Sequence, residues 1–174
     1  IISMNEAINQ SKQKKVKDST QVVITFDDGY YDNFKYAYPI LLNMGIKATY
    51  FLVTDYINSN KPIWDTELSN ALQYSANNVI IKNPINNLDI IRNKYNNHDF
   101  LWLLIDMLKK QSLEVREKIL NNIYKQLDFN SKFNNQNRCM EWKEIIEMQN
   151  NGMEFGSHSC SHSSLSNINL DESF

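Results

Sequence analysis

The sequence predicts an α/β fold built around a parallel sheet, and three features support this prediction. Residues 21–26 and 46–53 are apolar runs rich in β-branched and aromatic side chains, which suit the strands of a covered sheet. Between them, residues 32–44 place apolar side chains on one face of a helix. A strand, a helix and a second strand in this spacing are typical of a βαβ unit with a right-handed crossover and parallel strands.

The composition narrows the class of protein. The 174 residues are enough for one domain with a sizeable core, and 42% hydrophobic with 22% charged residues is typical of globular proteins. A net charge of −2 gives no electrostatic case for binding nucleic acid. No apolar run has the length of a membrane span, and residues 1–17 lack the apolar segment of a signal peptide. The sequence leaves the location open between the cytoplasm and the cell envelope.

The two cysteines and the two chain ends give little further information. Cys139 and Cys160 are too few for a disulfide scaffold and lack the C-x-x-C spacing, and a single bridge between them stays open. The chain begins with Ile1, and its last residues resemble the opening of a helix. We therefore expect a fragment at both ends.

The N-terminal third is expected to lead into the sheet. Residues 1–19 are polar and rich in lysine, which indicates a solvated arm or helix, so that the domain proper covers residues 20–174. In the helix at residues 32–44, Asp32 or Asn33 can cap the start, Gly45 can end it, and Pro39 predicts a kink or a break. Its predicted apolar face consists of Phe34, Ala37, Tyr38, Leu41 and Leu42.

The middle of the chain, at about residues 58–137, has a different character and is expected to be a mostly helical insertion. Residues 63–75, 99–110 and 113–127 have the apolar periodicity of helices, the last with Val115, Ile119, Ile123 and Leu127 in register. Residues 79–82 and 88–92 suggest a small hairpin.

After the insertion, a helix at residues 141–151 is expected to end at Gly152 and to lead into a strand at residues 153–157. The side chains of that helix that we expect to face inward are Trp142, Ile145, Ile146 and Met148.

Two adjacent carboxylates, Asp27 and Asp28, follow the first strand directly. Ionised carboxylates are costly to bury without a partner, and a metal ion is a natural one. In parallel sheets, sites form at the carboxyl ends of the strands, where this pair lies. The alternative is an ordinary turn, since Asp and Gly are common turn formers.

A histidine pair, His158 and His162, follows the last predicted strand. At positions i and i+4 the two imidazoles fall on one face of a helical turn and can hold one ion, and imidazole suits zinc and its neighbours. The alternative is a pair that caps a helix or is buried for packing. Because the aspartates also follow a strand, both motifs can meet at one end of the sheet. The third histidine, His98, lies among asparagines and is expected at the surface.

These residues resemble a known family. TFDDGY at residues 25–30 is similar to the first motif of the polysaccharide deacetylases (the NodB-homology domain, carbohydrate esterase family 4), and HSCSH at residues 158–162 to their second motif, H-[ST]-x-x-H. Residues 38–51 and 140–158 resemble the stretches beside these motifs, and WDTEL at residues 64–68 resembles a subgroup with a long helical insertion. The resemblance covers about residues 20–57 and 138–170.

The resemblance implies a role for each motif residue. Asp28, His158 and His162 would hold a divalent metal ion, with zinc as the first candidate, and Asp27 would be the general base that takes a proton from the metal-bound water. The backbone N–H of Tyr30 would help to hold the oxyanion. Adjacent aspartates can serve both roles because successive side chains at a strand end point to different sides.

The resemblance also implies a fold and a reaction. The fold would be part of a distorted (β/α)7 barrel, and the reaction the removal of N-acetyl groups from a polysaccharide or oligosaccharide. The family's later motifs, which supply an arginine and a general-acid histidine, would lie beyond Phe174. One alternative is therefore a truncated, inactive remnant that binds metal and carbohydrate. Another is a metal-dependent amidase with a different substrate.

Overall fold

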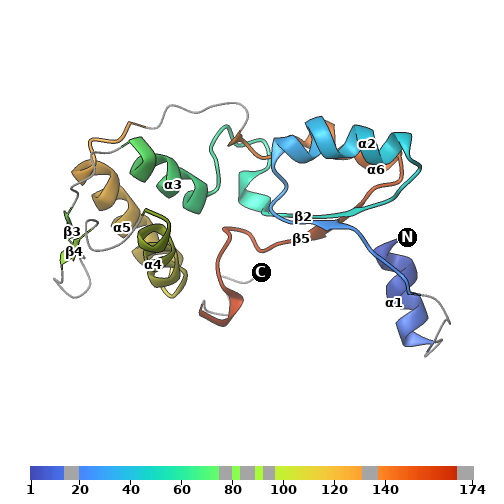
Figure 1. The fold of residues 1–174 in the computed structure, drawn as a ribbon, viewed down its shortest axis with the longest axis horizontal. Coiled ribbons are helices and arrows are strands. Elements are labelled where there is room, and N and C mark those ends of the chain that lie inside the picture. The colour runs from blue at the N-terminus through green and yellow to red at the C-terminus, as the bar shows by residue number, and fades with distance from the viewer. Residues whose placement is uncertain (14–19, 75–79, 83–88, 92–96, 131–136, 168–174) are drawn as a thin grey trace. The chain divides into compact units, whose positions relative to one another are not determined.

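The computed structural model describes residues 1–13, 20–74, 80–82, 89–91, 97–130 and 137–167 (Figure 1). The chain divides into two compact units. The first, which we call the sheet unit, contains Ile1–Lys61 and Asn134–Cys160. The second, the helical unit, contains Pro62–Phe133 and Ser161–Phe174.

The sheet unit is built on three parallel strands in the order β1-β2-β5, which confirms the predicted α/β class. Their bounds are Thr25–Phe26 for β1, Thr49–Leu52 for β2 and Glu154–Ser157 for β5. Strand β1 is shorter than the predicted residues 21–26. Its neighbour β2 begins opposite it at Thr49 and not at the predicted residue 46, and the N–H of Ile46 closes the preceding helix on the carbonyl of Leu41.

The first helical stretch is confirmed, but it is not one regular helix. A π-helical turn, η1 (Asn33–Ala37), precedes helix α2 (Tyr38–Asn43), whose first turn contains Pro39. Proline has no N–H for the carbonyl four residues earlier, so the regular helix starts around it. Gly45, with φ +65°, follows the helix end as predicted. The predicted Asp32 cap is wrong, because its side chain makes no capping hydrogen bond.

The core of the sheet unit centres on Tyr50, a fully buried residue of β2. Its ring stacks between those of Phe26 and Phe155, with centroid distances of 4.9 and 5.7 Å. Helix α2 and helix α6 (Trp142–Asn150) supply further buried side chains of this core, namely Tyr38, Leu41, Ile145 and Met148.

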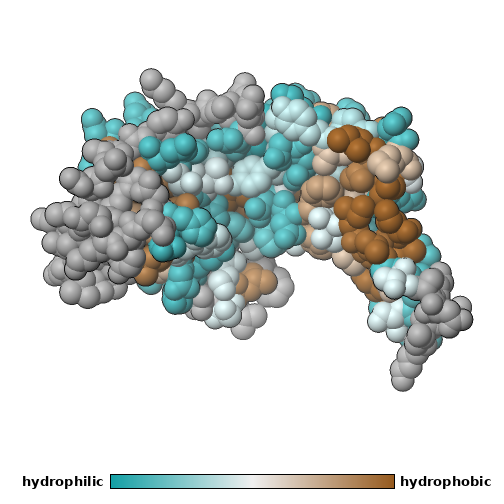
Figure 2. All heavy atoms as spheres, viewed as in Figure 1, coloured by the Kyte–Doolittle hydropathy of each residue, from teal (hydrophilic) through white to brown (hydrophobic). Residues whose placement is uncertain are grey.

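Three side chains predicted to face this core are exposed instead: Leu42, Trp142 and Ile146 expose 42%, 52% and 51% of their surface. Helix α6 buries a single stripe through Ile145 and Met148, and Trp142 and Ile146, four residues apart, form the neighbouring stripe. Figure 2 shows apolar surface gathered on the sheet unit, whose exposed apolar residues include Ile1, Val22, Ile40 and Met44.

The helical unit contains α3 (Trp64–Tyr74), α4 (Asn97–Lys109) and α5 (Leu113–Gln126), each within two residues of its predicted bounds. Strands β3 (Ile80–Lys82) and β4 (Asp89–Ile91) pair antiparallel as the predicted hairpin, whose remaining residues lie outside the described part of the chain. The fully buried apolar side chains of this unit include Ile63, Leu68, Phe100, Leu104, Leu108 and Ile123. Among the described residues, no helix combines the length and the apolar character that crossing a membrane requires.

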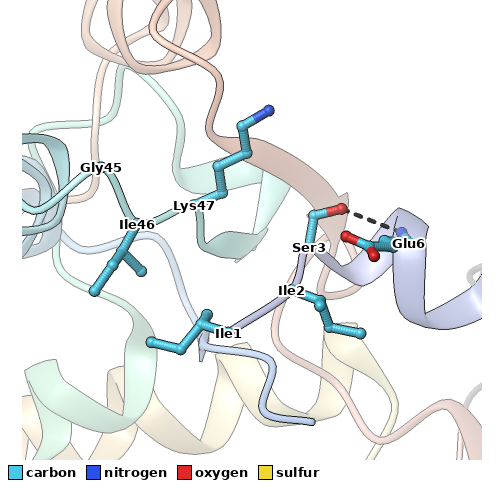
Figure 3. Close-up of a pocket in the computed structure, with 7 residues that line it drawn as sticks. All are labelled: Ile1, Ile2, Ser3, Glu6, Gly45, Ile46 and Lys47. Carbon is cyan, nitrogen blue, oxygen red and sulfur yellow. Dashed lines mark hydrogen bonds between the residues drawn. The ribbon is translucent and has the colours of Figure 1, made fainter. Parts of the chain in front are cut away.

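Segment Met4–Lys12 forms helix α1 of the sheet unit, within the stretch expected to be a polar arm or helix. Ser3 Oγ accepts a hydrogen bond from the N–H of Glu6 at 3.1 Å and thereby caps the start of α1. Beside it lies a cavity of about 480 Å³, lined by Ile1, Ser3, Glu6 and Ile46 among others (Figure 3). None of its lining residues belongs to the aspartate or histidine motif.

Candidate metal centre

The two aspartates lie in a tight turn that begins where β1 ends. Asp28 has φ +72° and Gly29 φ +74°, and the N–H of Gly29 donates to the carbonyl of Asp27 at 2.9 Å. Asp27 is exposed, whereas the Asp28 side chain exposes only 27% of its surface. The different surroundings of the two carboxylates therefore come from the left-handed turn and not from the alternation of a strand, which corrects the sequence argument.

The segment that precedes α6 holds this turn from the other side. The N–H of Tyr31 donates to the carbonyl of Arg138, and the N–H of Met140 donates to the carbonyl of Gly29, both at 2.9 Å. Tyr30 forms an isolated antiparallel bridge with Cys139. The backbone that carries the predicted oxyanion donor is therefore fixed between two hydrogen bonds.

Arg138 is the centre of a buried ion-pair cluster behind the turn. Its guanidinium donates two hydrogen bonds to Glu144, at 2.6 and 3.0 Å, and lies 3.9 Å from the ring centroid of Tyr31. The hydrogen bonds to Glu144 raise the pKa of Arg138 above its ordinary value, against the opposing effect of burial. Arg138 is thus a structural residue in the sheet unit.

The structure brings Asp28 and His158 together. Strand β5 ends at Ser157, and the N–H of His158 donates to the carbonyl of Leu52 at 2.8 Å. The side chain thereby sits at the carboxyl end of the sheet, as Asp28 does after β1. His158 Nε2 lies 3.5 Å from Asp28 Oδ1.

This pair fits a metal ion of the first transition row. Imidazole nitrogen and carboxylate oxygen are ordinary zinc ligands, and two ligand atoms of a tetrahedral zinc site with bonds near 2.1 Å lie about 3.4 Å apart. The separation of 3.5 Å between the two atoms matches that requirement. Both residues belong to the sheet unit.

His158 and His162 do not share a helical turn, so that prediction is wrong. Ser159 has φ +65° and His162 φ +55°, and the segment is irregular. In a helix the carbonyl of Ser159 would accept an N–H four residues later. Instead, the carbonyls of Ser159 and Cys160 accept the N–H groups of Thr54 and Asp55.

His162 belongs to the helical unit, where it contacts the start of α3. Its Nδ1 lies 3.1 Å from Asp65 Oδ2, and the indole N–H of Trp64 donates to its carbonyl at 3.2 Å. Burial raises the pKa of Asp65. The hydrogen bond from His162, its charge and the N–H of Thr66 outweigh burial, so the pKa of this carboxyl lies below its ordinary value.

Sequence reasoning missed Asp65 as a partner of His162. The WDTEL stretch marked the predicted insertion, but no spacing rule links its carboxylate to a histidine so far along the chain.

The other expectations concern the third histidine and the two cysteines. His98 is exposed, as predicted, with 77% of its side chain accessible, and Cys139 and Cys160 are free thiols.

Comparisons with known proteins place the chain in a family. The family model described as polysaccharide deacetylase matches residues 14–173. A Bacillus subtilis (strain 168) protein named "Putative polysaccharide deacetylase YxkH" is 34% identical over 73 residues, which are 42% of this chain and 26% of that protein. The solved BpsB deacetylase domain from Bordetella bronchiseptica aligns with a TM-score of 0.43 and 16% identity, over 91% of this chain and 38% of that one.

The chain thus spans about a quarter of the length of the curated relative that it matches. The family match extends over nearly all of its residues and includes both the turn with Asp27 and Asp28 and the segment with His158 and His162. This protein chain is a member of the polysaccharide deacetylase family.

Proposed function

We propose that this chain carries the metal-binding and water-activating residues of a hydrolase that removes N-acetyl groups from a polysaccharide. The observation that supports the proposal most directly is the contact of 3.5 Å between Asp28 and His158 at the end of the sheet. It occurs in a chain of the polysaccharide deacetylase family, between residues of that family's two motifs.

In this proposal Asp28, His158 and His162 hold a divalent ion, with zinc as the first candidate because two of the three donors are imidazoles. When bound, such an ion lowers the pKa of water and polarises an acetyl carbonyl. Asp28 and His158 are suited to this role because their ligand atoms are already close in the sheet unit.

Asp27 and Tyr30 act on the reacting atoms in this proposal. Asp27, an exposed carboxylate beside Asp28, takes a proton from the attacking water. The water oxygen bonds to the acetyl carbon, and the N–H of Tyr30 donates to the negative charge that develops on the carbonyl oxygen. The C–N bond then breaks, the proton that Asp27 took from the water passes to the amine nitrogen, and acetate leaves.

The substrate class follows from the family together with the chemistry. An N-acetylated sugar polymer or oligomer offers the amide that this residue set would hydrolyse. The partner we propose is therefore an N-acetylated polysaccharide or oligosaccharide.

Zinc titration by calorimetry, combined with acetate release from an N-acetylglucosamine oligomer by the full-length protein, tests the proposal. We expect His158→Ala to weaken zinc binding by on the order of 100-fold, because each ligand of a zinc site contributes several kcal/mol. Asp27→Asn should bind zinc normally and release no acetate, because it keeps the ligands and lacks the base.

The matched control is His98→Ala, which removes an exposed histidine outside both motifs. Equal zinc affinity in the wild type, His158→Ala and His98→Ala would show that the metal assignment is wrong. Undiminished acetate release by Asp27→Asn would remove Asp27 from the reaction.

A further inference from the structure

The helical unit holds His162 at both its side chain and its backbone. Asp65 Oδ2 lies 3.1 Å from the ring nitrogen Nδ1, and the indole N–H of Trp64 donates to the His162 carbonyl at 3.2 Å. The His162 side chain exposes 14% of its surface and that of Asp65 18%. The contact is therefore largely withdrawn from solvent. In such a partly buried environment a hydrogen bond to an ionised carboxylate is stronger than at an open surface.

A buried arginine fixes the chain on either side of this histidine. Arg116 of α5 exposes 2% of its surface and donates to the carbonyl of Ser161 and to Ser163 Oγ, both at 2.9 Å. Its guanidinium also lies 4.9 Å from the ring centroid of Trp64. The backbone at His162, which has φ +55°, is thus held by residues from two helices of the helical unit.

We propose that Asp65 is a positioning residue for His162: its carboxylate accepts the Nδ1–H and leaves the lone pair of Nε2 as the metal-binding atom. The proposal deepens the proposed function and rests on His162 being a ligand. It gives the start of α3 a defined role in the metal site, beyond marking the insertion.

The physical reason is the tautomer of the imidazole. A neutral histidine carries its proton on one nitrogen only, and the hydrogen bond of that nitrogen decides which one is free to bind a metal. A carboxylate can only accept, so the proton is held on Nδ1, the ring orientation is fixed and Nε2 becomes more basic. Loss of such a supporting carboxylate typically costs about 10–100-fold in metal affinity.

The first measurement uses the metal-free protein. The ¹⁵N shifts of the His162 ring nitrogens, recorded at mildly alkaline pH, report the tautomer. We expect the Nδ1–H form in the wild type and in Glu67→Gln, which removes a neighbouring carboxylate from the same helix. We expect a mixture of tautomers in Asp65→Ala, and an intermediate result in Asp65→Asn, whose amide has the same size and can either accept or donate.

The second measurement is zinc affinity for the same variants and for His162→Ala. We expect Asp65→Ala to bind zinc about 10–100-fold more weakly than the wild type, and Glu67→Gln to bind it equally well. If Asp65→Ala does not fold, which its amide NMR spectrum would reveal, Asp65→Asn takes its place and should lose a smaller part of the affinity.

The outcomes separate this inference from the proposed function. A His162 tautomer that is the same with and without the Asp65 carboxylate overturns the inference. Zinc affinity that falls in His162→Ala but not in the Asp65 variants also overturns it, and leaves the metal assignment standing. Zinc affinity unchanged in His162→Ala overturns the ligand role of His162 and, with it, the role of Asp65.

Discussion

Gly29 is the residue on which the aspartate turn depends most directly. Its φ of +74° lies in the left-handed region, and a Cβ added there would come within 2.6 Å of Leu52 Cδ2. Glycine meets both requirements without a shift of the buried Leu52 side chain. The close approach also brings Asp28 next to the end of β2, where the N–H of Val53 donates to the carbonyl of Asp28 at 3.5 Å.

We expect Gly29→Ala to lower the free energy of unfolding by about 2–3 kcal/mol, combining the left-handed strain with the clash against Leu52. Gly45→Ala is the matched control, because Gly45 has φ +65° but no atom within 4 Å of the added Cβ. It should cost only about 1 kcal/mol, the price of the backbone conformation. Urea unfolding midpoints measure both. Equal losses would show that the contact with Leu52 is relieved at no cost.

The contact between Asp28 and His158 was within reach of sequence reasoning, whereas the contact between Asp65 and His162 was not. Parallel strands bring their carboxyl ends to one edge, so residues that follow two such strands are expected to be close. Trp64 and His162, by contrast, are 98 positions apart and meet through the packing of the helical unit, which no short-range pattern encodes. The predicted helical turn failed because Thr54 and Asp55, which follow β2, supply N–H donors to the carbonyls that a helix would have used.

At the scale of elements, apolar periodicity located the helices well and the strands only approximately. The bounds of α4 and α5 followed from the sequence, and α5 buries Ile119 and Ile123 as predicted. Val115, predicted in the same stripe, is 37% exposed instead, and the next residue, Arg116, is buried in its place. The length of β1 depends on where its neighbour starts, which is a tertiary property. The same holds for α6, where only the packing decides which of two apolar stripes is buried.

Helix α1 is attached to the sheet unit through Glu154 of β5 and has no buried residue of its own. Glu154 accepts hydrogen bonds from the Asn5 side chain at 2.8 Å and its N–H at 3.3 Å, and from Thr49 Oγ1 at 3.1 Å. Burial raises the pKa of this carboxyl, but the hydrogen bonds together lower it by more, so the pKa of Glu154 lies below its ordinary value of 4.5.

The lowered pKa of Glu154 determines how the attachment of α1 depends on pH. Because the pKa of Glu154 is lowered in the folded state, its stabilising contribution is complete above pH 4.5 and is lost as the pH falls through the lower folded pKa. We expect hydrogen-exchange protection of the α1 amides to drop in this acidic range before that of β2. In Glu154→Gln the protection of α1 should be low already at neutral pH.

Glu147→Gln, which changes an exposed carboxylate of α6, is the control and should retain the wild-type profile. Protection of α1 that persists in Glu154→Gln at neutral pH would contradict the role of Glu154. The remaining backbone contact, from the N–H of Ile2 to the carbonyl of Val22 at 3.0 Å, would then be sufficient to hold the segment.

At the scale of the whole molecule, the family gives the sheet its context. The three parallel strands and the helices between them are the α/β class that the sequence predicted, and membership of the polysaccharide deacetylase family assigns them to its distorted (β/α) barrel. The insertion was predicted from its helical character. Its assignment as an insertion at about residues 58–137, within a domain covering residues 20–174, stays a prediction.

The proposed metal ligands lie far apart along the sequence, from Asp28 to His158 and His162, and this has a physical consequence. An unfolded chain does not keep such distant residues together. An ion held by the proposed ligands would therefore be bound by the folded chain and not by the unfolded one. Binding to the folded state alone raises the free energy of unfolding by mass action.

We accordingly expect zinc to stabilise the whole chain. At a free zinc concentration of about 100 times the dissociation constant, the gain is about 2.7 kcal/mol, which corresponds to a rise in Tm of about 5–10 °C for a chain of this length. Differential scanning calorimetry with zinc and with a chelator measures the shift. Asp28→Asn should shift far less at the same zinc concentration, because it lacks a carboxylate ligand, while Glu67→Gln should shift as the wild type does. An equal rise in Asp28→Asn and in the wild type would mean that zinc stabilises the chain through other groups, and the proposed centre would then lose its support.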